Sequence, residues 1–136
     1  MATYAGKIKT LIDNQLRVNS SGATTVSGTA QNKGTSTDLL LKVIVGLDGA
    51  TAVGGTTIPV IQGSNISAFT TPTTVTADKG TLSAGYTAAA TQVLHFGQLQ
   101  FQFYRIQVTS SAAATCNVSC VWDFHPVQDS VDATVQ

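Results

Sequence analysis

The stretch TCNVSCVWDF, Thr115 to Phe124, has the most regular alternation of apolar and polar side chains in the chain. Successive side chains of a β-strand point to opposite faces of a sheet, so a period of two predicts a strand with one buried face. The residues predicted to face the core are Cys116, Val118, Cys120, Trp122 and Phe124. The opposite phase holds Asn117, Ser119 and Asp123 and is interrupted only by Val121. We therefore predict that this strand forms part of the core of the domain.

The two cysteines of this strand are predicted not to pair with each other. Cys116 and Cys120 are four positions apart, which separates their Cα atoms by about 13 Å at roughly 3.3 Å per residue. A disulfide requires Cα atoms within about 7 Å of each other. The same separation, together with the small number of ligands, argues against a zinc site formed with His125. We expect both cysteines to act as small buried apolar residues.

A second stretch, LQFQFYRIQV from Leu99 to Val108, changes its alternation phase between Phe103 and Tyr104. Leu99, Phe101 and Phe103 share one phase, whereas Tyr104, Ile106 and Val108 share the other. A β-bulge inserts one residue and reverses the side-chain order, and strands that bend between two sheets use such bulges. One interpretation is therefore a bulge in a long strand of a two-sheet sandwich. The alternative is a strand that is apolar on both faces, one towards the core and one towards a partner subunit.

The rest of the sequence also indicates β-structure, in a single domain of residues 1–136. Residues 39–47, LLLKVIVGL, are apolar except for Lys42 and Gly46, which predicts a central strand covered on both faces. Pro59 within TTIPVIQG predicts an edge strand or a bulge, because proline cannot donate a hydrogen bond to a ladder. Thr, Ser, Ala, Gly and Val are abundant and Glu is absent, as is typical of an all-β protein. The residues together predict an all-β, single-domain β-sandwich.

The N-terminal segment, residues 1–18, is the one part of the chain in which we expect a helix. The residues near helical spacing, which form one apolar face, are Ile8, Leu11, Ile12 and Leu16. The alternative is a strand that uses Ile12, Leu16 and Val18. The segment either closes the sheet of its own domain or forms an arm that docks on a neighbouring subunit. The candidate docking residues of such an arm are Tyr4, Ile8, Leu11 and Ile12. Residues 129–136, DSVDATVQ, are expected to form a flexible tail.

Composition and charge argue against several classes of partner. Charged residues make up 10% of the chain, against roughly 25% in an ordinary soluble domain, and the formal net charge is zero. A near-zero net charge favours association. There is no basic run interleaved with aromatic residues, so no nucleic-acid partner is expected. No apolar stretch approaches the roughly 18 residues of a membrane span, and the N-terminus lacks the pattern of a secretory leader. We therefore expect synthesis in a cytoplasm and no membrane partner.

No motif in the sequence predicts catalysis, a metal site or a cofactor. His95 and His125 have no Ser, Cys or Asp partner at the spacing of a known catalytic motif. The glycines of AVGGTT are not followed by the Lys-Ser pair of a phosphate-binding loop. Asp129 and Asp132 are too few to indicate calcium binding. We predict that the protein is not an enzyme.

The chain resembles the small virion proteins of tailed bacteriophages, and capsid decoration (cement) proteins are the closest type. The resemblance covers the last third of the chain, in strands of the type FYRIQVTSS and TCNVSCVWDF, and has no motif that matches residue by residue. It implies a β-sandwich or jelly-roll module, often trimeric, that binds the major capsid protein on the outer capsid surface. A tail, fibre or head-appendage component, or a carbohydrate- or receptor-binding module, is the alternative. The predicted interface residues are Tyr4, Ile8, Leu11, Ile12 and Tyr104.

Overall fold

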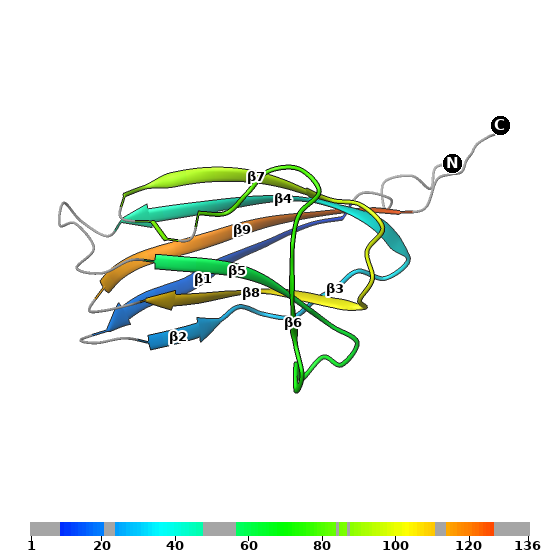
Figure 1. Ribbon diagram of the computed structural model, residues 1–136, viewed down its shortest axis with the longest axis horizontal. Coiled ribbons are helices and arrows are strands. Elements are labelled where there is room, and N and C mark those ends of the chain that lie inside the picture. The colour runs from blue at the N-terminus through cyan, green and yellow to red at the C-terminus, as the bar shows by residue number, and fades with distance from the viewer. Residues whose placement is uncertain are drawn as a thin grey trace.

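The computed structural model describes residues 9–20, 24–47, 57–83, 85–86, 88–110 and 114–126. Within these ranges the chain has nine strands and no helix, arranged as two antiparallel sheets packed face to face (Figure 1). The strands are β1 (Lys9–Ser20), β2 (Thr24–Ser27), β3 (Gln31–Asn32), β4 (Ser36–Leu47), β5 (Thr57–Ser64), β6 (Thr73–Val75), β7 (Ala90–Phe96), β8 (Phe103–Ser110) and β9 (Ala114–Pro126). The predicted all-β sandwich is confirmed.

The strand pairing defines a jelly roll. The first strand pairs with the last, β1 with β9, and the following pairs proceed inwards as β2 with β8, β4 with β7 and β5 with β6. Rolling this antiparallel ribbon brings β4 beside β9 and β5 beside β8. The result is one sheet in the order β1-β9-β4-β7 and a second in the order β2-β8-β5-β6, with the short β3 beside β8. Two sheets wound in this way are the defining feature of jelly-roll folds.

The core lies between the two sheets and follows the predicted alternation of β9. The side chains of Val118, Cys120 and Trp122 are fully buried, whereas their neighbours on the opposite phase are half-buried. The Trp122 ring stacks on that of Phe124, with ring centroids 6.1 Å apart and planes 8° from parallel. Cys120 is a buried thiol, as predicted, and the side chain of Cys116 lies outside the described residues.

The central strand β4 is buried on one face and not on both. It lies between β9 and β7, and its buried apolar residues are Leu39, Leu41, Val43 and Val45. On the opposite face, however, Leu40 is 39% exposed and Lys42 is also exposed. The prediction that this strand is central is therefore correct. The prediction that both of its faces are covered is wrong, because Leu40 and Lys42 are exposed. An apolar residue of β4, Leu40, thus lies on an outer face of the sandwich.

The predicted N-terminal helix is wrong, because residues 9–20 form the strand β1 along β9. Between the pairs Asp13–Cys120 and Leu16–Val118, β1 advances three residues while β9 advances two. This is a β-bulge, and it explains why the segment lacks a clean period of two. The register partners of the buried Trp122 and Val118 are Leu11 and Leu16, whose spacing of five residues is odd only because of the bulge. Pairing with β9 thus overrides a weak helical pattern.

The phase change at Phe103–Tyr104 marks the start of a strand and not a bulge. β8 begins at Phe103 and pairs with β5 in unbroken register to Ser110. Beyond Phe103 at its start, the outward phase of this strand is polar, with Arg105, Gln107 and Thr109, so the alternative of two apolar faces is also wrong. Leu99 and Phe101 precede the strand and pack, partly buried, against the core. Two alternation phases thus arise because a loop folds back before the strand begins.

The predicted edge strand is only locally correct, because β5 lies between β8 and the short β6 in the five-stranded sheet. The main-chain groups of Thr57 bond to those of Tyr86, on the side of β5 away from β8. Main-chain N–H and C=O groups of successive residues point to alternate sides of a strand. The N–H that Pro59 lacks would therefore point to the same side as that of Thr57, two residues earlier. The neighbouring strand β6 pairs only with Ile61 to Gly63 among the described residues. No ladder bond is therefore lost at Pro59.

Tyr104 gives the fold a testable dependence on alkaline pH. Burial raises the pKa of its phenol above the ordinary value of about 10, although neighbouring backbone hydrogen bonds oppose this shift. An unfolded chain loses this proton near pH 10 while the folded chain keeps it, so the free energy of unfolding falls as the pH rises through this region. We expect Tyr104→Phe to reduce that fall, as measured by urea unfolding at about pH 8 and about pH 10.5. An undiminished fall in the variant would contradict the assignment.

Candidate interaction surfaces

The two histidines lie beside aspartates, but neither pair extends to a third ligand. His125 Nε2 lies 3.4 Å from Asp123 Oδ2, and His95 Nδ1 lies 4.0 Å from Asp78 Oδ2. Among the described residues no group of three His, Cys, Asp or Glu side chains could hold a metal ion. The described ranges also contain no helix with the length and hydropathy of a membrane span.

The predicted interface residues do not come together in the described structure. Tyr4 and Ile8 lie outside the described residues, whereas Leu11 and Ile12 are in β1, opposite Trp122 and Val121 of β9. Tyr104 was a wrong choice, because its side chain is fully buried and its hydroxyl oxygen accepts a hydrogen bond from the Phe101 N–H at 3.0 Å. The sequence could place Tyr104 on a phase of its strand but could not show that this phase faces the core.

One apolar surface lies on the outer face of the four-stranded sheet. We call it the sheet-face patch, and it consists of Leu40, Ile44, Val93 and Val121. Leu40 is 39% and Val93 50% exposed, while Ile44 and Val121 are half-buried. The register places Lys42 between Val93 and Val121, with Leu40 and Ile44 next to it along β4. Diagonal neighbours on a sheet face are within reach of one another, so these residues form one surface and are not isolated exposures.

Charged and titratable groups border the sheet-face patch at the Leu40 end. The register partners of Leu40 are His95 on β7 and Asp123 on β9. The Asp123 side chain is 27% exposed, and its Oδ1 is buried without a hydrogen-bond partner. A buried carboxylate oxygen without a partner is unfavourable.

A second feature is the connection between β5 and β6, residues 65–72, which projects from the body of the sandwich (Figure 1). We call it the clamped loop. Arg105 of β8 places its guanidinium carbon 4.4 Å from the centroid of the Phe69 ring, and Arg105 Nε donates to Gln62 Oε1 at 2.8 Å. Phe69 is only 5% exposed and has a φ of 53°, a left-handed conformation that is unusual for a bulky residue. The side chain of Phe69 is thus held against the sheet.

Hydrogen bonds hold Asn65, Ile66 and Phe69 of the clamped loop and leave one apolar side chain outside. The Ile66 N–H donates to Ser64 Oγ at 3.0 Å, and the Phe69 N–H donates to the Ile66 carbonyl at 3.0 Å. Asn65 Oδ1 accepts the Gln102 N–H at 3.1 Å. Ile66 itself is 54% exposed, more than any other large apolar side chain that the structure describes. No sequence motif predicted this loop; the only signal was an isolated Ile and Phe in a run rich in Ser and Thr.

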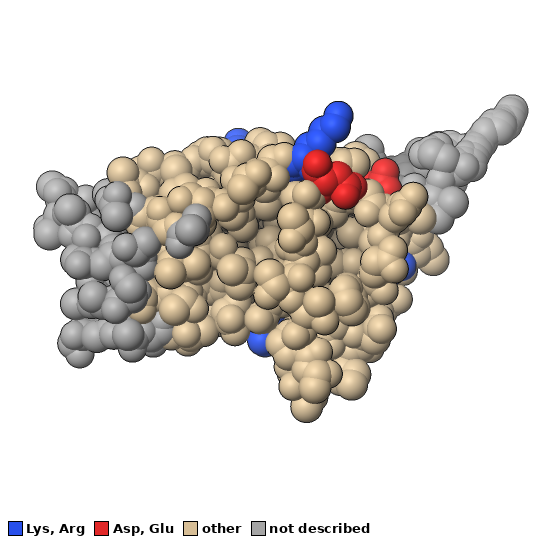
Figure 2. Space-filling model, in the orientation of Figure 1, with Lys and Arg blue, Asp and Glu red and all other residues tan. Residues whose placement is uncertain are grey.

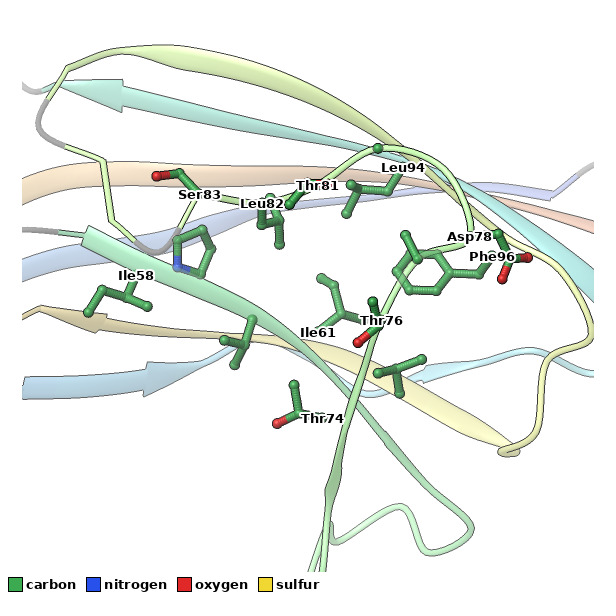
Figure 3. A pocket seen from close by; sticks show the side chains of 15 residues that line it. Ile58, Ile61, Thr74, Thr76, Asp78, Thr81, Leu82, Ser83, Leu94 and Phe96 are labelled. Carbon is green, nitrogen blue, oxygen red and sulfur yellow. The ribbon is translucent and has the colours of Figure 1, made fainter.

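The third feature is a groove of about 370 Å³ at the edge of the sandwich. It lies between β5 and the segment of residues 76–83 that crosses towards the other sheet (Figure 3). Ile61, Leu82, Leu94 and Phe96 point towards its interior, and the hydroxyls around it belong to Thr74, Thr76, Thr81 and Ser83. Asp78 is the charged residue among those that line the groove. The groove is open at this edge because β6 has only three residues.

The Asp78 side chain anchors the segment that closes the groove. Its Oδ2 accepts the Gly97 N–H at 2.6 Å, and the Asp78 N–H donates to the His95 carbonyl at 2.8 Å. Lys79 and His95 add a short antiparallel bridge. Residues 78 and 79 therefore tie this segment to β7.

Two comparisons with known proteins give no relative: no family model matches the chain, and no curated protein matches it. The class of the protein is therefore set by its topology, a jelly-roll β-sandwich. Jelly rolls occur in viral capsid proteins, lectins and cupins, so the fold alone does not select a function. A function must therefore be inferred from the surfaces described above.

Proposed function

We propose that the protein is a non-catalytic virion structural protein of the capsid decoration type, which oligomerises and binds the outer capsid surface to stabilise it. The observation that supports this proposal best is the sheet-face patch on a jelly roll. A strand as apolar as β4 is typical of positions covered on both sides, yet Leu40 lies exposed on its outer face. A protein neighbour, here the major capsid protein, would provide the missing cover.

The low charge of the surface supports a permanent assembly partner. Figure 2 shows that charged side chains are few on the face in view and that most of the described surface there is uncharged. Interface cores are depleted in charged residues, and hydroxyl side chains form hydrogen bonds without the desolvation cost of buried ions. We expect binding to the capsid to depend only weakly on salt concentration for the same reason.

The alternative functions receive less support from the described side chains. A carbohydrate-binding module generally needs an exposed aromatic side chain, yet none of the described aromatic residues is exposed. Phe69, the best candidate in the loops, is buried under Arg105. A tail, fibre or head-appendage role would use the same kind of surface. It differs from the decoration role in the part of the virus particle to which the protein binds.

The test is association with virus particles from the source of the sequence. We expect the protein to band with purified capsids, and Leu40→Asp or Val93→Asp to weaken its binding by about 30-fold or more, as for a buried interface residue. Thr25→Asp, at an exposed position of β2 on the other sheet, is the matched control and should bind as the wild type does. Particles without the protein, or binding to tails alone, would overturn the decoration role.

A further inference from the structure

We propose that the tip of the clamped loop inserts Ile66 into the edge groove of a second copy of the chain, so that one copy contacts the next head to tail. This inference adds the contact between subunits to the proposed assembly role and rests on that role only for its biological purpose. Both parts of the contact lie on the same subunit, the groove beside the N-terminal half of β5 and the loop after its C-terminal end.

Contacts hold the clamped loop in a conformation that includes a strained backbone position. A left-handed conformation is unfavourable at a non-glycine residue, and Phe69 adopts it at φ 53°. The Arg105 guanidinium over the Phe69 ring and the bonds of Ser64 and Asn65 hold the loop in place. The net effect is to leave Ile66, an apolar residue, exposed on a projecting loop. A loop that is ordered before binding loses little entropy on association.

The loop tip and the groove match in size and polarity. Asn65, Ser67 and Ala68 around Ile66 are small or short residues, so the tip has one large side chain. A cavity of about 150 Å³ holds a benzene ring, so a groove of about 370 Å³ has room for an isoleucine side chain and its neighbours. The apolar groove lining would contact the isoleucine, and the surrounding threonine and serine hydroxyls could bond to the exposed loop backbone.

The charges beside the loop and beside the groove are opposite in sign. The base of the clamped loop has the Arg105 guanidinium, and the charged residue that lines the groove is Asp78, whose side chain is 58% exposed. A cation beside the inserted tip and an anion beside the groove have the signs needed to orient the contact. Since a copy that gives its loop still has its own groove open, such contacts are heterologous and continue until a ring closes.

The experiment measures the mass of the isolated protein by light scattering across the micromolar range. We expect the wild type to form an oligomer. We expect Ile66→Asp to weaken the affinity between copies by about 30-fold or more. Thr76→Trp, which fills the groove from an exposed lining position, should have the same effect, whereas Thr73→Trp, on β6 but outside the groove lining, should not. Val93→Asp, on the sheet-face patch, should also keep the oligomer. Circular dichroism establishes that each variant is folded.

Mixing the two defective variants gives the decisive result. Ile66→Asp keeps an intact groove and Thr76→Trp keeps an intact loop, so a mixture should form a pair with one contact where each alone is monomeric. A wild-type monomer at all concentrations, an Ile66→Asp variant with the wild-type mass, or a mixture that stays monomeric would overturn the inference. Because particle binding is measured separately, a failure of the loop contact is distinguishable from a failure of the decoration role.

Discussion

Replacement of Trp122 by alanine should lower the free energy of unfolding by about 3–5 kcal/mol, as large-to-small substitutions of fully buried aromatic residues do. Trp122 has no exposed surface, stacks on Phe124, and pairs with Leu41 of β4 and Leu11 of β1 in the middle of the four-stranded sheet. Its removal would leave a cavity between two sheets that are too regular to collapse into it. Urea unfolding monitored by circular dichroism measures the loss, because the variant lacks the tryptophan signal.

Trp122→Phe is the matched control for this prediction. It keeps an aromatic ring and removes the indole N–H, which is buried without a hydrogen-bond partner. Since leaving such a group unpaired is itself unfavourable, we expect a smaller loss of about 1–2 kcal/mol. Trp122 is the only tryptophan in the chain, so wild-type fluorescence reports on this site alone. Native emission like that of free tryptophan, with ready quenching by acrylamide, would contradict the buried position.

The sequence predicted the fold wherever one strand face is buried and the register is unbroken. The alternation of Val118, Cys120 and Trp122 survives in the structure because β9 has a strand on each side and the second sheet across the core. It failed where a local irregularity changes the phase. The bulge after Asp13 gave the apolar residues of β1 a spacing close to that of a helix. The loop before Phe103 has an alternating pattern like that of a strand. Bulges depend on pairing partners far away in the chain, which a local pattern does not contain.

The interaction surfaces were less accessible to sequence reasoning than the fold. The apolar character of residues 39–47 was visible, but its division into a buried face and the exposed Leu40 needed the sheet geometry. The clamped loop depends on Arg105 and Phe69, which are far apart in the chain and meet only through the pairing of β5 with β8. The groove exists because β6 is short and residues 76–83 cross beside β5, which is a property of topology.

Gly80→Ala is the second substitution with a large expected effect, a loss of about 3 kcal/mol or more of unfolding free energy. Gly80 has a φ of +84°, where an L-residue is strained by about 1–2 kcal/mol. A Cβ at this position would also collide with the carbonyl oxygen of Val93 and lie 3.0 Å from Leu94 Cδ2. The carbonyl belongs to the backbone of β7 and cannot rotate away, so overpacking adds to the strain. Thermal and urea unfolding should both show the loss.

Gly34→Ala separates the two causes, because Gly34 also has a positive φ, +60°, but no atom within 4 Å of the added Cβ. We expect this variant to lose only the conformational part, about 1 kcal/mol. The difference between the two variants therefore measures how tightly the segment anchored by Asp78 lies against β7. Equal losses in Gly80→Ala and Gly34→Ala would mean that this segment moves freely enough to accept a methyl group, and that the edge groove it borders does not have the fixed shape that insertion of Ile66 requires.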